Sequence, residues 1–184
     1  MSSFLFGFAL VLLVSLGARD QVLVARLAGR TGPGILVAGA IAAVVSAVIM
    51  AWAGDRIAAI LPPAAALMLV AFALVAAAIE LAWPAKQADP KEPTHSIFAA
   101  FIVLLARQIG DAGRFLIFAL AAWTGLPVLT AMGGALGGVA ALTLGWLLGD
   151  RLQASLPLRP IRIVLAVIVF GAAIVIGLSI RGII

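Results

Sequence analysis

Long uncharged runs alternate with short polar stretches along the whole chain. The runs cover residues 1–18, 31–54, 57–79, 93–106, 115–149 and 163–180. A helix needs about 20 mostly apolar residues to cross the hydrocarbon core of a bilayer. The pattern therefore predicts six transmembrane helices, the fourth of which continues through the charged residues that follow its short run.

Proline and glycine residues mark the expected helix ends. Helices are predicted over residues 4–27, 34–53, 63–83, 96–123, 127–148 and 160–180. The longest polar stretch, residues 84–95, is predicted to be a linker. It divides the chain into a first repeat, residues 1–83, and a second repeat, residues 96–184.

The two halves share landmarks at a nearly constant separation. Gly17 and Thr31-Gly32 recur 93 residues later, and Gly54-Asp55-Arg56 and Leu61-Pro62 recur 95 residues later. Such agreement indicates an internal duplication. Because each half has three helices, the second half must enter the membrane from the opposite side. The predicted fold is an all-α membrane protein with an inverted 3+3 repeat, a plan that places substrates near the midplane between the repeats.

Composition supports a membrane location and excludes several functions. The 184 residues are 65% hydrophobic and 10% charged, with a mean hydropathy of +1.28. The net charge of +5 comes from scattered basic residues, which argues against a nucleic-acid surface. With no cysteine and one histidine, His95, the chain offers no thiolate metal site and no nucleophile, base and orienting-group set. We expect no enzymatic activity and no cofactor.

Basic residues also predict the orientation. Seven fall at the ends of the first, third and fifth helices or in the connections after them: Arg26, Arg30, Lys86, Lys91, Arg151, Arg159 and Arg162. Arg56 and Arg181 fall on the opposite side. The positive-inside rule places the linker in the cytoplasm and both termini outside. We expect the cytoplasmic membrane of a prokaryote.

Two charged motifs interrupt the apolar segments at corresponding places. Residues 15–20 read Ser-Leu-Gly-Ala-Arg-Asp, and residues 108–113 read Gln-Ile-Gly-Asp-Ala-Gly. Charged side chains inside hydrocarbon usually pair with one another or line a substrate path. A functional site is therefore expected at these motifs.

Together with the duplication and the Gly-Asp-Arg sequence after the second helix of each half, these motifs resemble the transmembrane protein 165 / Gdt family of Ca²⁺/Mn²⁺-proton exchangers. The resemblance covers almost the whole chain. The family signature is Glu-x-Gly-Asp-(Lys/Arg)-(Ser/Thr), once per half. The first copy keeps the glycine as Gly17 and the basic residue as Arg19. It has Ser15 in place of Glu, Ala18 in place of Asp and Asp20 in place of Ser/Thr. The second copy keeps the glycine as Gly110 and the aspartate as Asp111. It has Gln108 in place of Glu, Ala112 in place of Lys/Arg and Gly113 in place of Ser/Thr.

The resemblance implies a secondary transporter that moves cytosolic Mn²⁺ or Ca²⁺ out in exchange for protons, with its site between the first and fourth helices. Asp20 and Asp111 would contact the cation or the proton and are the candidate metal ligands. The polar ligands would be Ser15, Gln21 and Gln108. The side chains that tune or gate the site would be Arg19, Arg107 and Arg114. The hinges would be Gly17 and Gly110.

Charge argues against assuming a divalent cargo. Two intact motifs would sum to about two negative charges, whereas Asp20 and Asp111 against Arg19, Arg107 and Arg114 sum to plus one. In a continuous helix Asp111 would lie in one stripe with Arg107 and Arg114. Asp111 is therefore expected to be compensated by basic neighbours.

Several other assignments follow from the sequence. Glu80, near the end of the third helix, is expected to reach the lipid headgroups. Asp55-Arg56 and Asp150-Arg151 are expected just beyond helix ends. Glycines four apart in the fifth helix, such as Gly133 and Gly137, favour close helix packing over a dimerisation face.

Two alternatives to cation exchange stay open. Arg19 with Asp20, and Arg107 with Asp111, could be structural ion pairs in a membrane protein that does not transport and serves as a structural or regulatory partner. The surplus of arginine would instead suit an exporter of an anionic or zwitterionic metabolite. The expected partners are the transported ion, the lipid bilayer and, as a further candidate, a second copy of the chain.

Overall fold

The computed structural model describes residues 1–84, 97–149, 151–152 and 157–180, without the side chains of residues 29–31. These residues form helices and short connections, with no strand among them. The helices are α1 (Ser2–Val14), α2 (Arg19–Thr31), α3 (Gly34–Ala59), α4 (Pro63–Ala82), α5 (Ile97–Ile109), α6 (Ala112–Thr124), α7 (Pro127–Leu148) and α9 (Leu158–Ser179). The predicted linker, residues 84–95, lies outside the described residues except for Pro84, and so does His95.

Proline and glycine mark several helix ends, as predicted. Pro63 and Pro127 occupy first-turn positions in α4 and α7, where a missing N–H costs nothing. Gly125 ends α6 in the left-handed conformation, with φ at 63°. Helix boundaries of this kind can be predicted from the sequence because the cause is local.

One predicted boundary is wrong, because α3 continues to Ala59 rather than ending at residue 53. Asp55 and Arg56 therefore lie within the helix, while Asp150 lies outside the described residues. Gly54 does not stop the helix. A Cβ on Gly54 would collide with the carbonyl oxygen of Phe118 in α6, so the glycine permits a close backbone approach.

Two of the predicted spans are broken into pairs of shorter helices. The first breaks at residues 15–18, and the axes of α1 and α2 differ by 67°. The break includes Gly17, whose φ of 74° favours glycine. The fourth breaks between α5 and α6, where Asp111 adopts an extended conformation with φ −86° and ψ 148°.

The described helices long and apolar enough to cross a membrane are α3, α4, α7 and α9, or five spans if α1 and α2 count as one. Helices α5 and α6 are apolar but shorter. The six-span inverted repeat and its division at residues 84–95 therefore stay predictions. Large apolar side chains such as Ile41, Phe72 and Val167 face outward, as lipid contact requires. The chain is an integral membrane protein.

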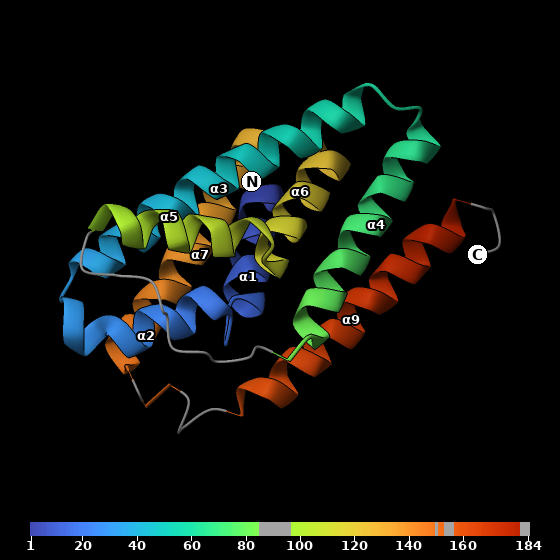
Figure 1. The fold of residues 1–184 in the computed structure, drawn as a ribbon. Coiled ribbons are helices and arrows are strands. Elements are labelled where there is room, and N and C mark those ends of the chain that lie inside the picture. The colour runs from blue at the N-terminus through green and yellow to red at the C-terminus, as the bar shows by residue number, and fades with distance from the viewer. Residues whose placement is uncertain (85–96, 150, 153–156, 181–184) are drawn as a thin grey trace.

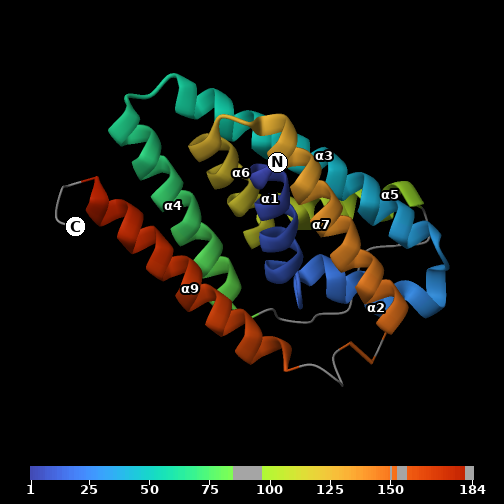
Figure 2. The ribbon, with the colours of Figure 1, turned by 180° about the vertical axis from the view of Figure 1, so that it is seen from behind.

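Helix packing is partly symmetric between the two halves (Figures 1 and 2). Each half contains a pair of short helices followed by two long ones. Corresponding long helices pack together, α3 on α7 and α4 on α9. Contacts of α1 and α2 with α7 have counterparts in those of α5 and α6 with α3. Two copies related by a twofold axis would show this scheme, although α4 also packs on α6 without an equally extensive α2–α9 contact.

Glycines in α7 permit the closest of these contacts. A Cβ on Gly133 would collide with the carbonyl oxygen of Phe4, and one on Gly137 would lie 2.5 Å from that of Phe8. One on Gly134 would lie 2.5 Å from Ile117 Cδ1 of α6. Small residues thus bring α7 against α1 and α6 within one chain, as membrane helix packing favours.

Candidate functional site at the two helix breaks

Both predicted acidic site residues lie at helix beginnings next to the breaks. Asp20 is in the first turn of α2, and its Oδ1 accepts a 2.8 Å hydrogen bond from the backbone N–H of Gln21. Asp111 is the N-cap of α6, and its Oδ2 accepts a 3.1 Å bond from the backbone N–H of Gly113. Both side chains are buried. Carboxylates suit these positions because exposed N–H groups give a helix a positive N-terminal end.

A buried hydrogen-bonded chain joins the two breaks. Gln108 Nε2 donates to Asp20 Oδ2 at 3.0 Å, which connects α5 to α2. Gln108 Oε1 accepts from Arg114 Nη2 at 2.9 Å. Arg114 Nε donates to Ser46 Oγ of α3 at 2.7 Å, and this oxygen lies 3.1 Å from Gln108 Oε1. Four helices therefore contribute one polar side chain each to a single network.

Asp111 lies beside this network. It interacts electrostatically with Asp20 and Arg114. A Cβ on Gly113 would lie 3.0 Å from Asp111 Oδ2 and 3.4 Å from Ser15 Oγ. Ser15 of the first break and Asp111 of the second therefore both lie next to Gly113.

Gln21 anchors the first break. Its Oε1 accepts a 2.7 Å bond from the backbone N–H of Gly17, and its Nε2 donates to the carbonyl oxygen of Ala141 in α7 at 2.7 Å. Both ends of the amide group are therefore engaged by backbone groups.

The non-transporting alternative expected an ion pair within each motif, and this expectation is wrong. Within the described part of the chain, Arg19 makes no ion pair with Asp20, and neither does Arg107 with Asp111. Arg19 Nε instead lies 3.8 Å from Glu80 Oε1. The predicted stripe assumed a continuous helix. The break at Gly110 redirects the chain, so Arg107 remains half-buried on α5 while Arg114 joins the network from α6.

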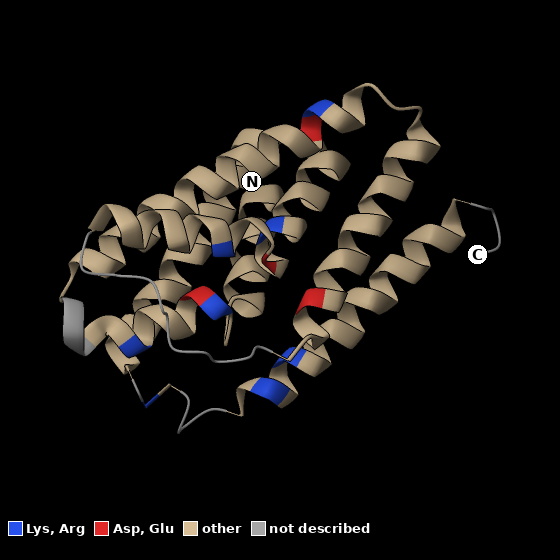
Figure 3. Ribbon diagram, in the orientation of Figure 1, with Lys and Arg blue, Asp and Glu red and all other residues tan. Residues whose placement is uncertain are grey.

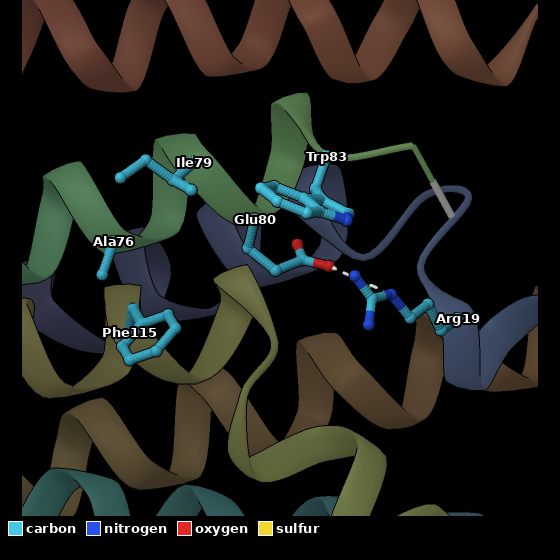
Figure 4. Close-up of a pocket in the computed structure, with 6 residues that line it drawn as sticks. All are labelled: Arg19, Ala76, Ile79, Glu80, Trp83 and Phe115. Atoms are coloured by element: carbon cyan, nitrogen blue, oxygen red, sulfur yellow. Dashed lines mark ion pairs between the residues drawn. The ribbon is translucent and has the colours of Figure 1, made fainter. Parts of the chain in front are cut away.

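Glu80 forms a second charged cluster that the sequence did not predict. Arg162 Nη2 of α9 donates to Glu80 Oε2 at 2.9 Å and lies 3.3 Å from the Glu80 carbonyl oxygen. The side chains of Glu80 and Arg162 are only 10% and 7% exposed, so the expected headgroup position of Glu80 is wrong. Figure 4 shows the carboxylate directed toward Arg19, next to Trp83 and across from Phe115. These residues line a hollow of about 470 Å³.

Both missed participants had a weak sequence signal. Ser46 is the polar residue in the middle of the uncharged run 31–54, and Glu80 is an acidic residue at the end of an apolar run. Polar side chains in such segments usually have partners on other helices. The sequence could not say which partners, because that depends on how the helices pack.

The structure changes the predicted charge balance of the site. Charged residues lie at the breaks and near one end of α4 and α9, and others lie further along α2 and near one end of α3 (Figure 3). Asp20, Asp111 and Arg114 sum to minus one at the inner network. Arg19 and Arg162 against Glu80 sum to plus one at the second cluster. Among the described residues, no group of three or more acidic, histidine or cysteine side chains could hold a metal ion.

Comparison with known proteins gives a family match. Residues 96–181 match the family described as divalent cation/proton antiporter GDT1. The match begins where the second repeat is predicted to begin, and it confirms the family resemblance over residues 96–181, which include the second motif. No curated protein and no solved structure matches the chain.

Proposed function

Because residues 96–181 match the divalent cation/proton antiporter GDT1 family, we propose that this chain is a secondary transporter that exchanges a cation for protons at its two helix breaks. The family is a transporter family rather than an enzyme class. The proposed site contains Asp20 and Asp111 as the charged groups and Ser15, Gln108 and Ser46 as neutral oxygen donors. Broken helices at such a site bring helix ends and carboxylates into the membrane interior.

The observation that carries this proposal is the 3.0 Å bond from Gln108 to Asp20. It joins the altered signature of one half directly to that of the other. A change in how the halves pack would have to break or rearrange this bond. The state of the carboxylate and the arrangement of the two halves are thereby coupled.

Exchange follows from the chemistry of a buried carboxylate. A carboxylate binds a proton or ligates a cation, and uncompensated charge within hydrocarbon is costly. An occupied site is therefore favoured when the halves rearrange. Alternate loading from the two sides of the membrane would couple cation movement to opposite proton movement. Cytosolic cation efflux driven by proton entry is the direction we propose.

The test is proton flux in proteoliposomes that contain a trapped pH dye. An imposed cation gradient should drive proton movement in the wild type. Asp111→Asn should reduce this flux at least about tenfold because it removes the charge, while asparagine caps a helix about as well as aspartate. Asp55→Asn, which removes an acid from the far part of α3, should keep the wild-type flux.

A non-transporting structural role is the second candidate, and one observation favours it. Gln108, Arg114 and Ser46 already have protein partners. That role predicts that Asp111→Asn and the wild type are alike in showing no cation-dependent proton flux. Equal, substantial flux in both proteins would instead remove Asp111 from the site.

A further inference from the structure

Arg114 is enclosed by three helices. Its side chain is 1% exposed, and its guanidinium donates to Gln108 Oε1 of α5 and Ser46 Oγ of α3. A Cβ on Gly138 of α7 would lie 3.3 Å from Arg114 Nη1 and 3.6 Å from Ala43 Cβ. The guanidinium thus packs into a space that the missing side chain of Gly138 leaves.

The guanidinium engages the neutral oxygens that a cation at this site would use. Gln108 Oε1 and Ser46 Oγ each accept one of its N–H groups. The Nε2 of the same glutamine holds Asp20 Oδ2. Ca²⁺ needs six to eight oxygen ligands. Arg114 therefore occupies two of the oxygens that such an ion would need at this site.

Charge balance points the same way. With both carboxylates ionised, Asp20, Asp111 and Arg114 sum to minus one. One proton or one monovalent cation neutralises the site. A divalent cation would leave a net positive charge buried in the membrane, which is unfavourable.

Comparison of the two repeats shows that the contact made by Arg114 does not require a positive charge. Arg114 follows Gly110 by four residues, just as Gln21 follows Gly17. Gln21 bonds to Ala141 of α7, whereas Arg114 bonds to Ser46 of α3. Each side chain ties its break to the long helix of the other half. A neutral amide is enough for that contact in the first repeat, so the charge in the second repeat is an addition.

We infer that Arg114 is a tethered cation that excludes divalent ions from the site and restricts it to a singly charged cargo. This inference rests on the proposed function and names the cargo class. It agrees with the absence of the motif carboxylates at Ser15, Ala18 and Gln108. Fewer carboxylates and one guanidinium together leave a site whose charge a single positive charge balances.

The test compares Na⁺, K⁺, Ca²⁺ and Mn²⁺ chloride gradients in the proton-flux assay. In the wild type, Na⁺ or K⁺ should drive proton movement at least about tenfold faster than Ca²⁺ or Mn²⁺. Arg114→Gln supplies the side chain found at the corresponding position of the first repeat. It should raise the flux driven by Ca²⁺ or Mn²⁺ at least about tenfold.

Two further variants isolate the charge. Arg114→Lys loses the planar fork but keeps the positive charge, so it should still exclude divalent ions. Arg56→Gln removes a guanidinium from the exposed end of α3 and should behave as the wild type. Mn²⁺ should raise the melting temperature of Arg114→Gln and not that of Arg114→Lys.

Three results would overturn the inference. They are wild-type flux driven as fast by divalent as by monovalent ions, a folded Arg114→Gln with no gain toward Ca²⁺ or Mn²⁺, and equal gains in the glutamine and lysine variants. The wild-type comparison needs no variant, so it stands even if Arg114→Gln does not fold. If no cation of either charge drives flux in any of these proteins, the proposed function itself fails.

Discussion

The carboxylate of Glu80 interacts with two guanidinium groups from different helices. Its Oε2 accepts a bond from Arg162 of α9, and its Oε1 lies 3.8 Å from Arg19 at the beginning of α2. Arg162 Nη1 is buried without a hydrogen-bond partner among the described residues. Glu80 is therefore the main compensation for a guanidinium buried between α4 and α9.

Removing this carboxylate should destabilise the protein strongly. Glu80→Gln leaves Arg162 charged and buried, and breaking a buried pair on one side costs about 3 kcal/mol or more. Thermal unfolding in detergent should show a clearly lower melting temperature. Replacing both partners with leucine should recover most of the loss, because the charge is then removed as well.

Asp55→Asn serves as the control for loss of an acidic side chain elsewhere. Its melting temperature should stay close to that of the wild type. If Glu80→Gln has the same melting temperature as Asp55→Asn, the pair of Glu80 with Arg162 contributes little to stability, and Glu80 is free for another role.

At the scale of the element, α7 depends on glycine where it meets α1. The backbone of α1 approaches Gly133 so closely that a Cβ would overlap the carbonyl group of Phe4. In α9, by contrast, a Cβ on Gly171 would have nothing within 4 Å. The two glycines have the same chemistry and opposite surroundings.

Alanine at these two positions should therefore have opposite effects. Gly133→Ala should destabilise the protein by about 1–3 kcal/mol, because α1 must move away from α7. Gly171→Ala should be neutral or stabilising by up to about 1 kcal/mol, since alanine is the better helix former. Melting temperatures in detergent would compare them, and equal effects would show that the close α1–α7 contact is not needed.

At the scale of the whole molecule, the question is how many times the chain crosses the membrane. Four long helices and the bent pair of α1 and α2 give up to five spans, and α5 with α6 would complete six. The matching contacts of α3 with α7 and α4 with α9 favour two equivalent halves. Six spans require both ends of the described chain on one face.

Single cysteines can test this topology without background, because the chain has no cysteine. Ser2→Cys and Ser179→Cys should react with a membrane-impermeant maleimide from the outer face of intact cells. Pro84→Cys should react only after the membrane is opened. All three native residues are exposed. Labelling of residues 2 and 179 from opposite faces would contradict the inverted 3+3 repeat.

Much of the fold could be predicted because its causes are local. Pro63 and Pro127 begin helices, and Gly125 ends one, through backbone restrictions that each residue carries itself. Asp20, Gln108 and Arg114 were found as site candidates because charge and polarity are exceptional in apolar segments. Their mutual contacts were not predicted in this form.

The errors share one cause. The predicted pairing of Asp111 with Arg107 assumed an uninterrupted helix, and the predicted headgroup position of Glu80 assumed no partner on another helix. Both assumptions consider one helix in isolation from its neighbours. A break or a neighbouring helix changes where a side chain points without changing the hydropathy of the segment.

The sequence by itself determined that this is a helical membrane protein, and it predicted two related halves with polar motifs at corresponding positions and glycines at close helix contacts. Hydropathy, proline and glycine act over a few residues, so these features follow from the chain alone. Only the tertiary structure decided that Gln108 bonds to Asp20, that Arg114 reaches Ser46 and that Glu80 meets Arg162. Such partners lie 68 to 88 residues apart, and packing alone brings them within hydrogen-bonding distance.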